Sequence, residues 1–219
     1  MPALPRRAPD TMTQFFSIHP ANPQPRLIRQ AAELVRSGKV IAYPTDSCYA
    51  LGCRLDDREA IERIRAIRAL DAKHHLTLVC RDLSEVARYA RVDNRQFRLL
   101  KSATPGSYTF ILEATREVPK RLQHPRRNTI GLRVPDHPVA QALLGELDEA
   151  ILSTSLVLPG DELPLNDAEE IRERLEGQVD LIIDSGACGF ETTTVVDLTG
   201  AGPQVLRAGK GQLGVFGLA

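Results

Sequence analysis

Residues 40–52 read VIAYPTDSCYALG and hold the two patterns from which the fold class follows. The apolar run 40–43 ends at Pro44, which is typical of a short strand buried in a sheet. Directly after it come two hydroxyls, a carboxylate and a phenol, from Thr45, Asp46, Ser47 and Tyr49. The stretch therefore predicts a ligand-facing loop at a strand end, with a simple turn closed by an Asx-type hydrogen bond as the alternative.

Helical and strand patterns alternate on both sides of this stretch. A helical pattern from Leu27 stops at Gly38, and Asp57 can cap a second helix that runs to Ile67. Further strands are predicted at 76–80, 108–114, 131–134, 151–154, 179–184, 193–198 and 204–207, and further helices at 84–89, 93–101, from Pro138, and from an Asn166 cap to Glu176. This order predicts one α/β domain with a mixed sheet of at least seven strands.

Several short polar segments follow or precede these strands. They are TPGSYT (104–109), GLRVP (131–135), STS (153–155), TTTVVD (192–197) and RAG (207–209). In open α/β sheets the strand ends converge on a ligand crevice, so we expect some of these segments to meet there. Each segment alone is equally explained as a turn, and an arginine inside a strand such as Arg133 is also explained by an ion pair.

The charge of the chain is distributed unevenly along the sequence. The formal net charge is zero, but residues 1–144 carry +10, residues 145–197 carry −12 and the last 22 residues carry +2. This asymmetry predicts one basic face for anions, with Arg68, Arg133 and Arg207 converging on it and the acidic segment elsewhere. The basic run 116–133 adds Arg121, Arg126 and Arg127 as candidate contacts to RNA phosphates, the alternative being a solvated face.

The composition favours a cytoplasmic protein without a membrane segment. No apolar run approaches the length of a membrane-spanning helix, and the four cysteines lack the spacing of disulfide or zinc motifs. We therefore expect reduced thiols and no metal bound by protein side chains. Residues 1–13 are expected to be a disordered extension, with Met1 and Met12 as alternative starts, and residues 211–219 a tail.

The segments PTDSCYALG, TPGSYTF, GLRVP, STS, TTTVVDL and RAG, taken in this order, resemble the YrdC/YciO family over residues 14–210. The resemblance is nearest to the YciO branch, and the best-known members of the family are threonylcarbamoyl-AMP synthases. It implies a YrdC-like domain: a twisted open mixed sheet of seven or more strands with flanking helices and a deep, positively charged concave face. In the synthases that face binds ATP with Mg²⁺, L-threonine and bicarbonate.

The resemblance also assigns residues to subsites, without assigning any catalytic side chain. Contacts to a threonine-like substrate fall on Thr45, Ser47, Tyr49 and Thr193. Contacts to the nucleotide fall on Arg68, Pro105, Gly106, Thr109, Ser153, Ser155 and Arg207. The basic run 116–133, and not the motifs, supplies the candidates for RNA or phosphate contacts, which are Arg121, Arg126, Arg127 and Arg133.

Three positions depart from the synthase pattern. A Lys-x-Arg motif is replaced by Arg68-Ala69-Leu70, a Ser-x-Asn motif ends in Ser155, and Cys80 stands where a histidine is common. We therefore expect a protein that binds nucleotide or double-stranded RNA, with chemistry related to threonylcarbamoyl-AMP and tRNA modification but inefficient synthesis. The alternatives are a full synthase and a non-catalytic module that binds double-stranded RNA.

Overall fold

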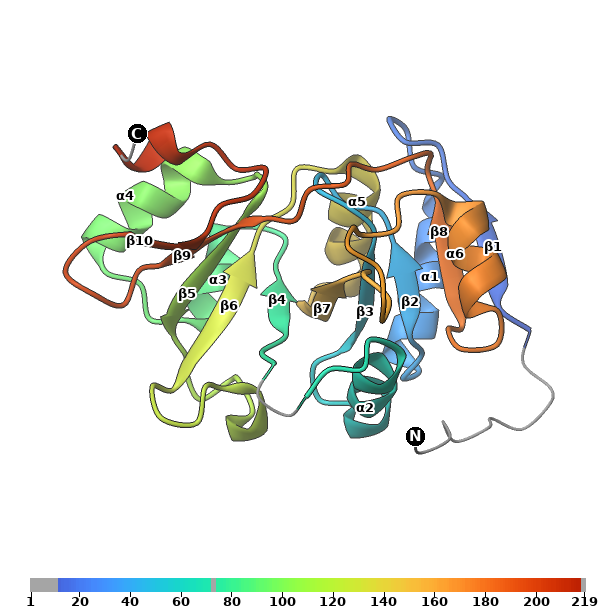
Figure 1. Ribbon diagram of the computed structural model, residues 1–219, viewed down its shortest axis with the longest axis horizontal. Helices are drawn as coiled ribbons and strands as arrows, with labels where there is room; N and C mark the ends of the chain where they lie inside the picture. Colours follow the sequence, from blue (N-terminus) through green and yellow to red (C-terminus); the bar gives the residue numbers. More distant parts are fainter. Residues whose placement is uncertain (1–11, 72–73, 218–219) are drawn as a thin grey trace.

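The computed structural model describes residues 12–71 and 74–217, and ten strands within them form one mixed sheet (Figure 1). The order across the sheet is β1-β8-β2-β3-β7-β4-β6-β5-β9-β10. The strands are β1 (Gln14–Ser17), β2 (Ile41–Tyr43), β3 (Ala50–Arg54), β4 (Thr77–Val79), β5 (Tyr108–Glu113), β6 (Thr129–Arg133), β7 (Ile151–Ser155), β8 (Leu181–Asp184), β9 (Thr194–Asp197) and β10 (Gln204–Arg207). The predicted α/β class with a mixed sheet is confirmed.

Helices cover the sheet on both faces. They are α1 (Pro25–Arg36), α2 (Arg58–Ile67), α3 (Leu83–Tyr89), α4 (Asn94–Ala103), α5 (Pro138–Leu147) and α6 (Ala168–Leu175), with 3-10 turns η1 (Lys120–Leu122) and η2 (Leu213–Phe216). Prolines occupy the first turns of α1 and α5, where a missing N–H costs nothing. These two helices pack in one apolar cluster, and residues of the other four helices belong to a second, larger one.

The helix starts were predicted well except at α6. Asp57 and Asp93 cap α2 and α4 as expected, and Gly38 follows α1 with a φ of 79°. The predicted Asn166 cap is wrong, because the Asp167 side chain accepts from the backbone N–H groups of Glu169 and Glu170. Asp167 lies one residue closer, so its carboxylate reaches two free amides of the first turn. The helix also ends at Leu175, before the predicted Glu176.

Two strands were not predicted. β1 pairs in parallel with β8 at one edge of the sheet, and its pattern is too short to read from sequence. β3 begins at Ala50, inside the stretch taken as a polar loop, and pairs antiparallel with β2 and β7. The tight approach of Tyr43 and Ile151 to Gly52 explains why this strand carries a glycine.

Both ends of the described chain contact the domain. Residues 1–11 of the expected extension lie outside the described residues, whereas Thr13 is buried and donates a hydrogen bond to the carbonyl of Val179 at 2.8 Å. Within the expected tail, Phe216 packs edge-to-face on Tyr108 with ring centroids 5.5 Å apart, and residues 218–219 lie outside the described part. None of the described helices is long and apolar enough to cross a membrane.

Candidate functional site

A cavity of about 290 Å³ lies over strands β7, β4, β6, β5 and β9. Hydroxyl-bearing side chains line it, namely Thr77, Thr109, Thr129, Ser153, Thr154, Ser155, Thr192 and Thr193. Its charged lining is basic, with Arg68, Arg127, Arg133 and Arg207 joined by His74, His75 and His124. Within residues 12–71 and 74–217, no carboxylate lines it.

This cavity confirms the predicted convergence of Arg68, Arg133 and Arg207 on one face. The acidic segment 145–197 contributes only neutral residues to the lining, as far as the structure describes the chain. Zero net charge therefore coexists with a locally basic lining, because no described acidic side chain of that segment lines the cavity, although Asp197 pairs with Arg127 beside it.

The register of the sheet explains why hydroxyl groups from neighbouring strands lie together on the floor of the cavity. Thr77 of β4 lies between Ser153 of β7 and Gly131 of β6, so these residues share one face of the pleated sheet. A Cβ atom on Gly131 would lie 3.2 Å from both Thr77 Oγ1 and Thr109 Cγ2, which is a tight contact. Glycine at this position therefore keeps the floor of the cavity open.

One side of the floor is fixed by Tyr43. Its hydroxyl donates to Ser153 Oγ at 2.9 Å, and Ser153 Oγ donates in turn to the carbonyl of Leu51 at 2.8 Å. Burial raises the pKa of Tyr43 to about 12, so the phenol keeps its proton and remains the donor. Ser153 is thereby held in one orientation.

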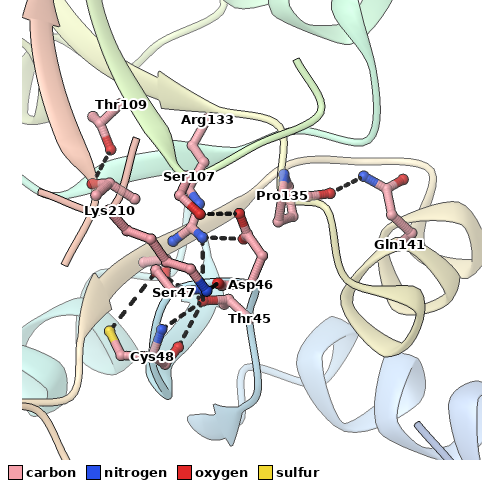
Figure 2. Close-up of polar contacts among 12 residues, drawn as sticks. Thr45, Asp46, Ser47, Cys48, Ser107, Thr109, Arg133, Pro135, Gln141 and Lys210 are labelled. Atoms are coloured by element: carbon pink, nitrogen blue, oxygen red, sulfur yellow. Dashed lines mark hydrogen bonds and ion pairs between the residues drawn. The ribbon is translucent and has the colours of Figure 1, made fainter. Parts of the chain in front are cut away.

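At the carboxyl ends of β4 and β6 lies what we call the Asp46 end of the cavity, a cluster in which Arg133 lines the cavity and Thr45, Asp46, Ser107 and Lys210 lie behind it. Arg133 pairs with Asp46 there, and the two side chains are only 7% and 9% exposed. Arg133 also donates to Thr45 Oγ1 at 3.2 Å, and Ser107 Oγ donates to Asp46 Oδ2 at 2.7 Å (Figure 2). Lys210 reaches the backbone carbonyl of Asp46. The Nε of Arg133 is buried without a partner.

Strands β9 and β10 supply a third wall. The hydroxyls of Thr109 and Thr193 lie 2.8 Å apart, and Arg207 donates to the backbone carbonyl of Thr193 at 2.9 Å. The backbone at Gly209 approaches the carbonyl of Thr192 so closely that a Cβ there would lie 2.3 Å from its oxygen. A glycine at 209 therefore lets Arg207 lie at the cavity wall.

The amino ends of β4 and β6 form the opposite, histidine end of the cavity (Arg68, His74, His75, His124 and Arg127). Because β4 and β6 are parallel, the residues that precede both strands meet at this end. Arg68 follows α2 and donates to the backbone carbonyl of Val157, and its Nε is buried without a partner. Arg127 pairs with Asp197 at 2.8 Å.

Asp197 keeps its charge at the histidine end. Burial alone would raise the pKa of its carboxyl, but hydrogen bonds from Thr199 and the charge of Arg127 outweigh burial. The pKa of Asp197 therefore lies below the usual value, and the carboxylate remains ionised beside Arg127.

Three residues expected to contact substrate are buried behind the cavity instead of lining it. Thr45, Ser47 and Tyr49 are at most 2% exposed. Tyr49 donates to the carbonyl of Gly186 at 2.9 Å, and a Cβ on Gly189 would lie 2.6 Å from the carbonyl oxygen of Ser47. The segment around 186–189 thus packs over the loop, and only Thr45 reaches the cavity, through its hydrogen bond with Arg133.

Four further candidates lie outside the cavity lining. Pro105 and Gly106 form the turn before β5, where the Gly106 amide donates to the carbonyl of Val134 at 2.9 Å. Arg121 donates to the carbonyl of Asp56 at 2.9 Å, and Arg126 is exposed in the turn before β6. Of the four residues proposed for RNA, only Arg127 and Arg133 line the cavity.

Sequence reasoning missed part of the lining. Thr77 and Thr129 stand in period-two alternation with Val79 and Gly131, but alternation alone does not say which face carries a ligand. His74, His75 and His124 were not proposed as ligand contacts. Cys48, Cys53 and Cys80 are fully buried, and among the described residues no His, Cys, Asp or Glu group is arranged to hold a metal.

Comparison with known proteins adds the family context. The Sua5–YciO–YrdC family model, described as telomere recombination, matches residues 33–209. YciO of Escherichia coli is 59% identical over 205 residues, covering 94% of this chain and 100% of YciO, and its crystal structure superposes with a TM-score of 0.90. The threonylcarbamoyl-AMP synthase of Halorhodospira halophila is 29% identical over 178 residues, covering 81% of this chain and 92% of the synthase.

A solved structure of P. abyssi Sua5 in complex with L-threonine is also similar. Its TM-score is 0.82 at 28% identity, and the match covers 90% of this chain and 58% of that longer chain. The resemblance drawn from the sequence motifs is thus confirmed, and the identity to YciO, 59%, is about twice that to the Halorhodospira halophila synthase, 29%.

Proposed function

Because this chain belongs to the Sua5–YciO–YrdC family, we propose that its cavity binds ATP with Mg²⁺ beside L-threonine and performs threonylcarbamoyl-AMP chemistry slowly. The observation that carries the proposal is the lining: hydroxyls and arginines surround a space that no described carboxylate enters. Such a lining suits an anionic ligand rich in oxygen. The buried, unpartnered Nε atoms of Arg68 and Arg133 support it, since a ligand oxygen would satisfy both.

The two ends of the cavity suit different parts of the substrates. At the Asp46 end, Arg133 is the cation that lines the cavity, and the carboxylate of an amino acid is complementary to it. At the histidine end, Arg68 and Arg127 suit phosphate oxygens. Because no described carboxylate lines the cavity, Mg²⁺ would be held mainly by the phosphates of the ATP that brings it.

In this reaction the carbamate formed from threonine and bicarbonate attacks the α-phosphorus of ATP. A carbamate O–P bond forms, and the bond to pyrophosphate breaks with its electron pair on the leaving oxygen. The protein's part is to position the two substrates and to stabilise negative charge with arginine and hydroxyl donors, without a covalent nucleophile.

Two substitutions explain why we propose slow turnover. Leu70, in place of an arginine, packs with the apolar core and lines a groove beside α2, outside the cavity. Ser155 offers a hydroxyl where the synthases carry an amide. A missing charge-assisted contact costs about 1.5–3 kcal/mol. That loss corresponds to roughly one to two powers of ten in rate.

The direct test is an assay with ATP, Mg²⁺, bicarbonate and L-threonine, with the product identified by mass. We expect ATP to bind and threonylcarbamoyl-AMP to form at least about tenfold more slowly than with a family synthase under the same conditions. Omitting threonine is the matched control and should abolish the product. Equal rates would overturn the proposal of slow turnover, and absence of ATP binding would overturn the proposed function.

A role in binding double-stranded RNA is the second candidate. It is supported by Arg58, Arg65 and Arg121, which line a shallow groove between α2 and η1, with Arg126 exposed nearby in sequence. Such contacts would be to phosphates, so binding should weaken steeply with salt. A gel-shift titration of duplex RNA at two salt concentrations tests this, with the Arg121→Ala variant expected to reduce the salt slope by about one. Absent or salt-independent binding would exclude it.

A further inference from the structure

Three histidines meet at one end of the cavity, and the proposed chemistry leaves them without a role. His74 and His75 precede β4, and His124 lies in the turn that leads to β6. The rings of His75 and His124 are 4.9 Å apart between centroids, with planes inclined by 34°. All three line the cavity beside Arg68 and Arg127. Two distant segments of the chain thus bring imidazoles and guanidinium groups to the same rim.

The cationic surroundings disfavour a charge on His74 and His75. Partial desolvation, followed by the charges of Arg68 and Arg65 and by His75, lowers the pKa of His74, while Asp71 opposes the shift. Partial desolvation, followed by His124, Arg65 and Arg127, lowers the pKa of His75. Both histidines are exposed at the rim, so solvent limits these shifts. At neutral pH both rings are therefore mainly neutral.

His124 is held in place by hydrogen bonds within its own turn. Its Nδ1 accepts the backbone N–H groups of Arg126 at 3.3 Å and Arg127 at 3.2 Å. These two bonds hold the imidazole ring in the position in which it lies beside His75.

We propose that the histidine end of the cavity binds a phosphate group and that a proton joins His75 as the anion binds. The proposal rests on the proposed function only where the phosphate belongs to a nucleotide. Without an anion, Arg68 and Arg127 repel a further positive charge. An anion that contacts both arginines offsets this repulsion and favours a positive charge on the neighbouring histidine. Its affinity then rises as the pH falls through the range in which histidine titrates. Once the anion is bound, the histidines thus add positive charge to the rim that already carries Arg68 and Arg127.

Sulfate is a suitable probe, because it stays a dianion from about pH 5 to about pH 8, where histidines titrate. Any proton taken up with sulfate therefore belongs to the protein. We would follow the ring resonances of the five histidines by NMR over this range, with and without sulfate at constant ionic strength. The titration midpoint of His75 should move upward by up to about one pH unit, which corresponds to up to tenfold tighter binding to the protonated form.

His19 is a built-in control for this measurement. Its Nδ1 accepts the backbone N–H groups of Ala21 and Asn22 at 3.2 and 3.1 Å, as His124 does in its own turn, but His19 is exposed and does not line the cavity. Its midpoint should stay unchanged when sulfate is added. Movement of His19 together with the cluster would reveal a general salt effect and overturn the proposal.

Substitution completes the test. His75→Gln should flatten the pH dependence of sulfate affinity by calorimetry, while His19→Gln should leave it as in the wild type. Failure of sulfate to bind, or binding that shifts no cluster histidine, would overturn the proposal directly on the wild-type chain. A parallel titration with AMP distinguishes this inference from the proposed nucleotide function. If sulfate binds with proton uptake but AMP does not bind, the inference is supported and the nucleotide function is overturned. If AMP binds without a shift of the histidine midpoints, the nucleotide function is supported and the inference is overturned.

Discussion

The two ends of the cavity use arginine in opposite ways. At the Asp46 end, Arg133 is buried and already paired with Asp46, which also accepts from Ser107. At the histidine end, Arg68 donates to the backbone carbonyl of Val157, and the Arg127–Asp197 pair is half-exposed on its arginine side. The first arrangement neutralises its cation before any ligand arrives, whereas the second leaves positive charge available to an anion.

This difference assigns separate tasks to the two ends. A plain anion gains little at the Asp46 end, because it would have to compete with a carboxylate that is already in place. At the histidine end the proposed phosphate would meet no such competitor at Arg68, which donates to a backbone carbonyl. This difference is our reason for proposing the amino acid at one end of the cavity and the phosphate at the other.

The largest expected effect is on the free energy of unfolding, where substitutions at the two ends of the cavity should differ most. Asp46→Ala leaves Arg133 buried without its partner and should lower the free energy of unfolding by about 3–5 kcal/mol. Arg127→Ala at the other end removes a half-exposed partner and should cost about 1 kcal/mol or less. Urea denaturation of both variants measures the contrast.

A double variant separates the ion pair from local packing. Asp46→Ala combined with Arg133→Met removes both charges and should recover much of the loss, because no buried charge is left unpaired. Equal costs for Asp46→Ala and Arg127→Ala would mean that the two ends do not differ in the way described.

The pairing of Arg133 shows how far sequence alone could go. The arginine within an apolar strand was recognised, with an ion pair and an anion site as open explanations. Its partner Asp46 is 87 residues away in the chain, so only the folded sheet shows that the pair exists. Local patterns fixed where strands and caps lie, as at Asp57 and Asp93, because these depend on neighbouring residues.

Three residues predicted to contact substrate do not line the cavity, and the reason is a contact that is distant in the sequence. Thr45, Ser47 and Tyr49 look like a ligand loop, but the segment around Gly186 and Gly189 packs over them. That close approach depends on backbone from the other end of the chain, which periodicity cannot reveal. The histidine end was missed for the same reason, since His75 and His124 become neighbours only through the parallel pairing of β4 and β6.

The next largest effect is expected on the affinity for ATP at the histidine end. Arg68→Ala should weaken ATP binding by about 10- to 100-fold, since it removes a charge-assisted phosphate contact of about 1.5–3 kcal/mol. Because Arg68 is only partly buried and its hydrogen bond goes to the backbone carbonyl of Val157, its loss should cost little stability. Isothermal titration calorimetry measures the affinity. Arg29→Ala, on an exposed position of α1 away from the cavity, is the matched control and should bind ATP as the wild type does.

The smallest expected effect is on the rate of threonylcarbamoyl-AMP formation, and it concerns the side chain at position 155. Ser155 lines the cavity on β7, two residues beyond Ser153 toward the amino end of β4. Ser155→Asn restores the amide of the synthase motif, and one neutral hydrogen bond of about 0.5–1.5 kcal/mol should raise threonylcarbamoyl-AMP formation by about 2- to 10-fold. Ser155→Ala is the matched control, because it removes the hydroxyl without adding an amide, and it should not increase the rate. If Ser155→Asn binds ATP normally but gives no gain, the amide is not what the cavity lacks, and the missing cation at position 70 becomes the main cause of slow turnover.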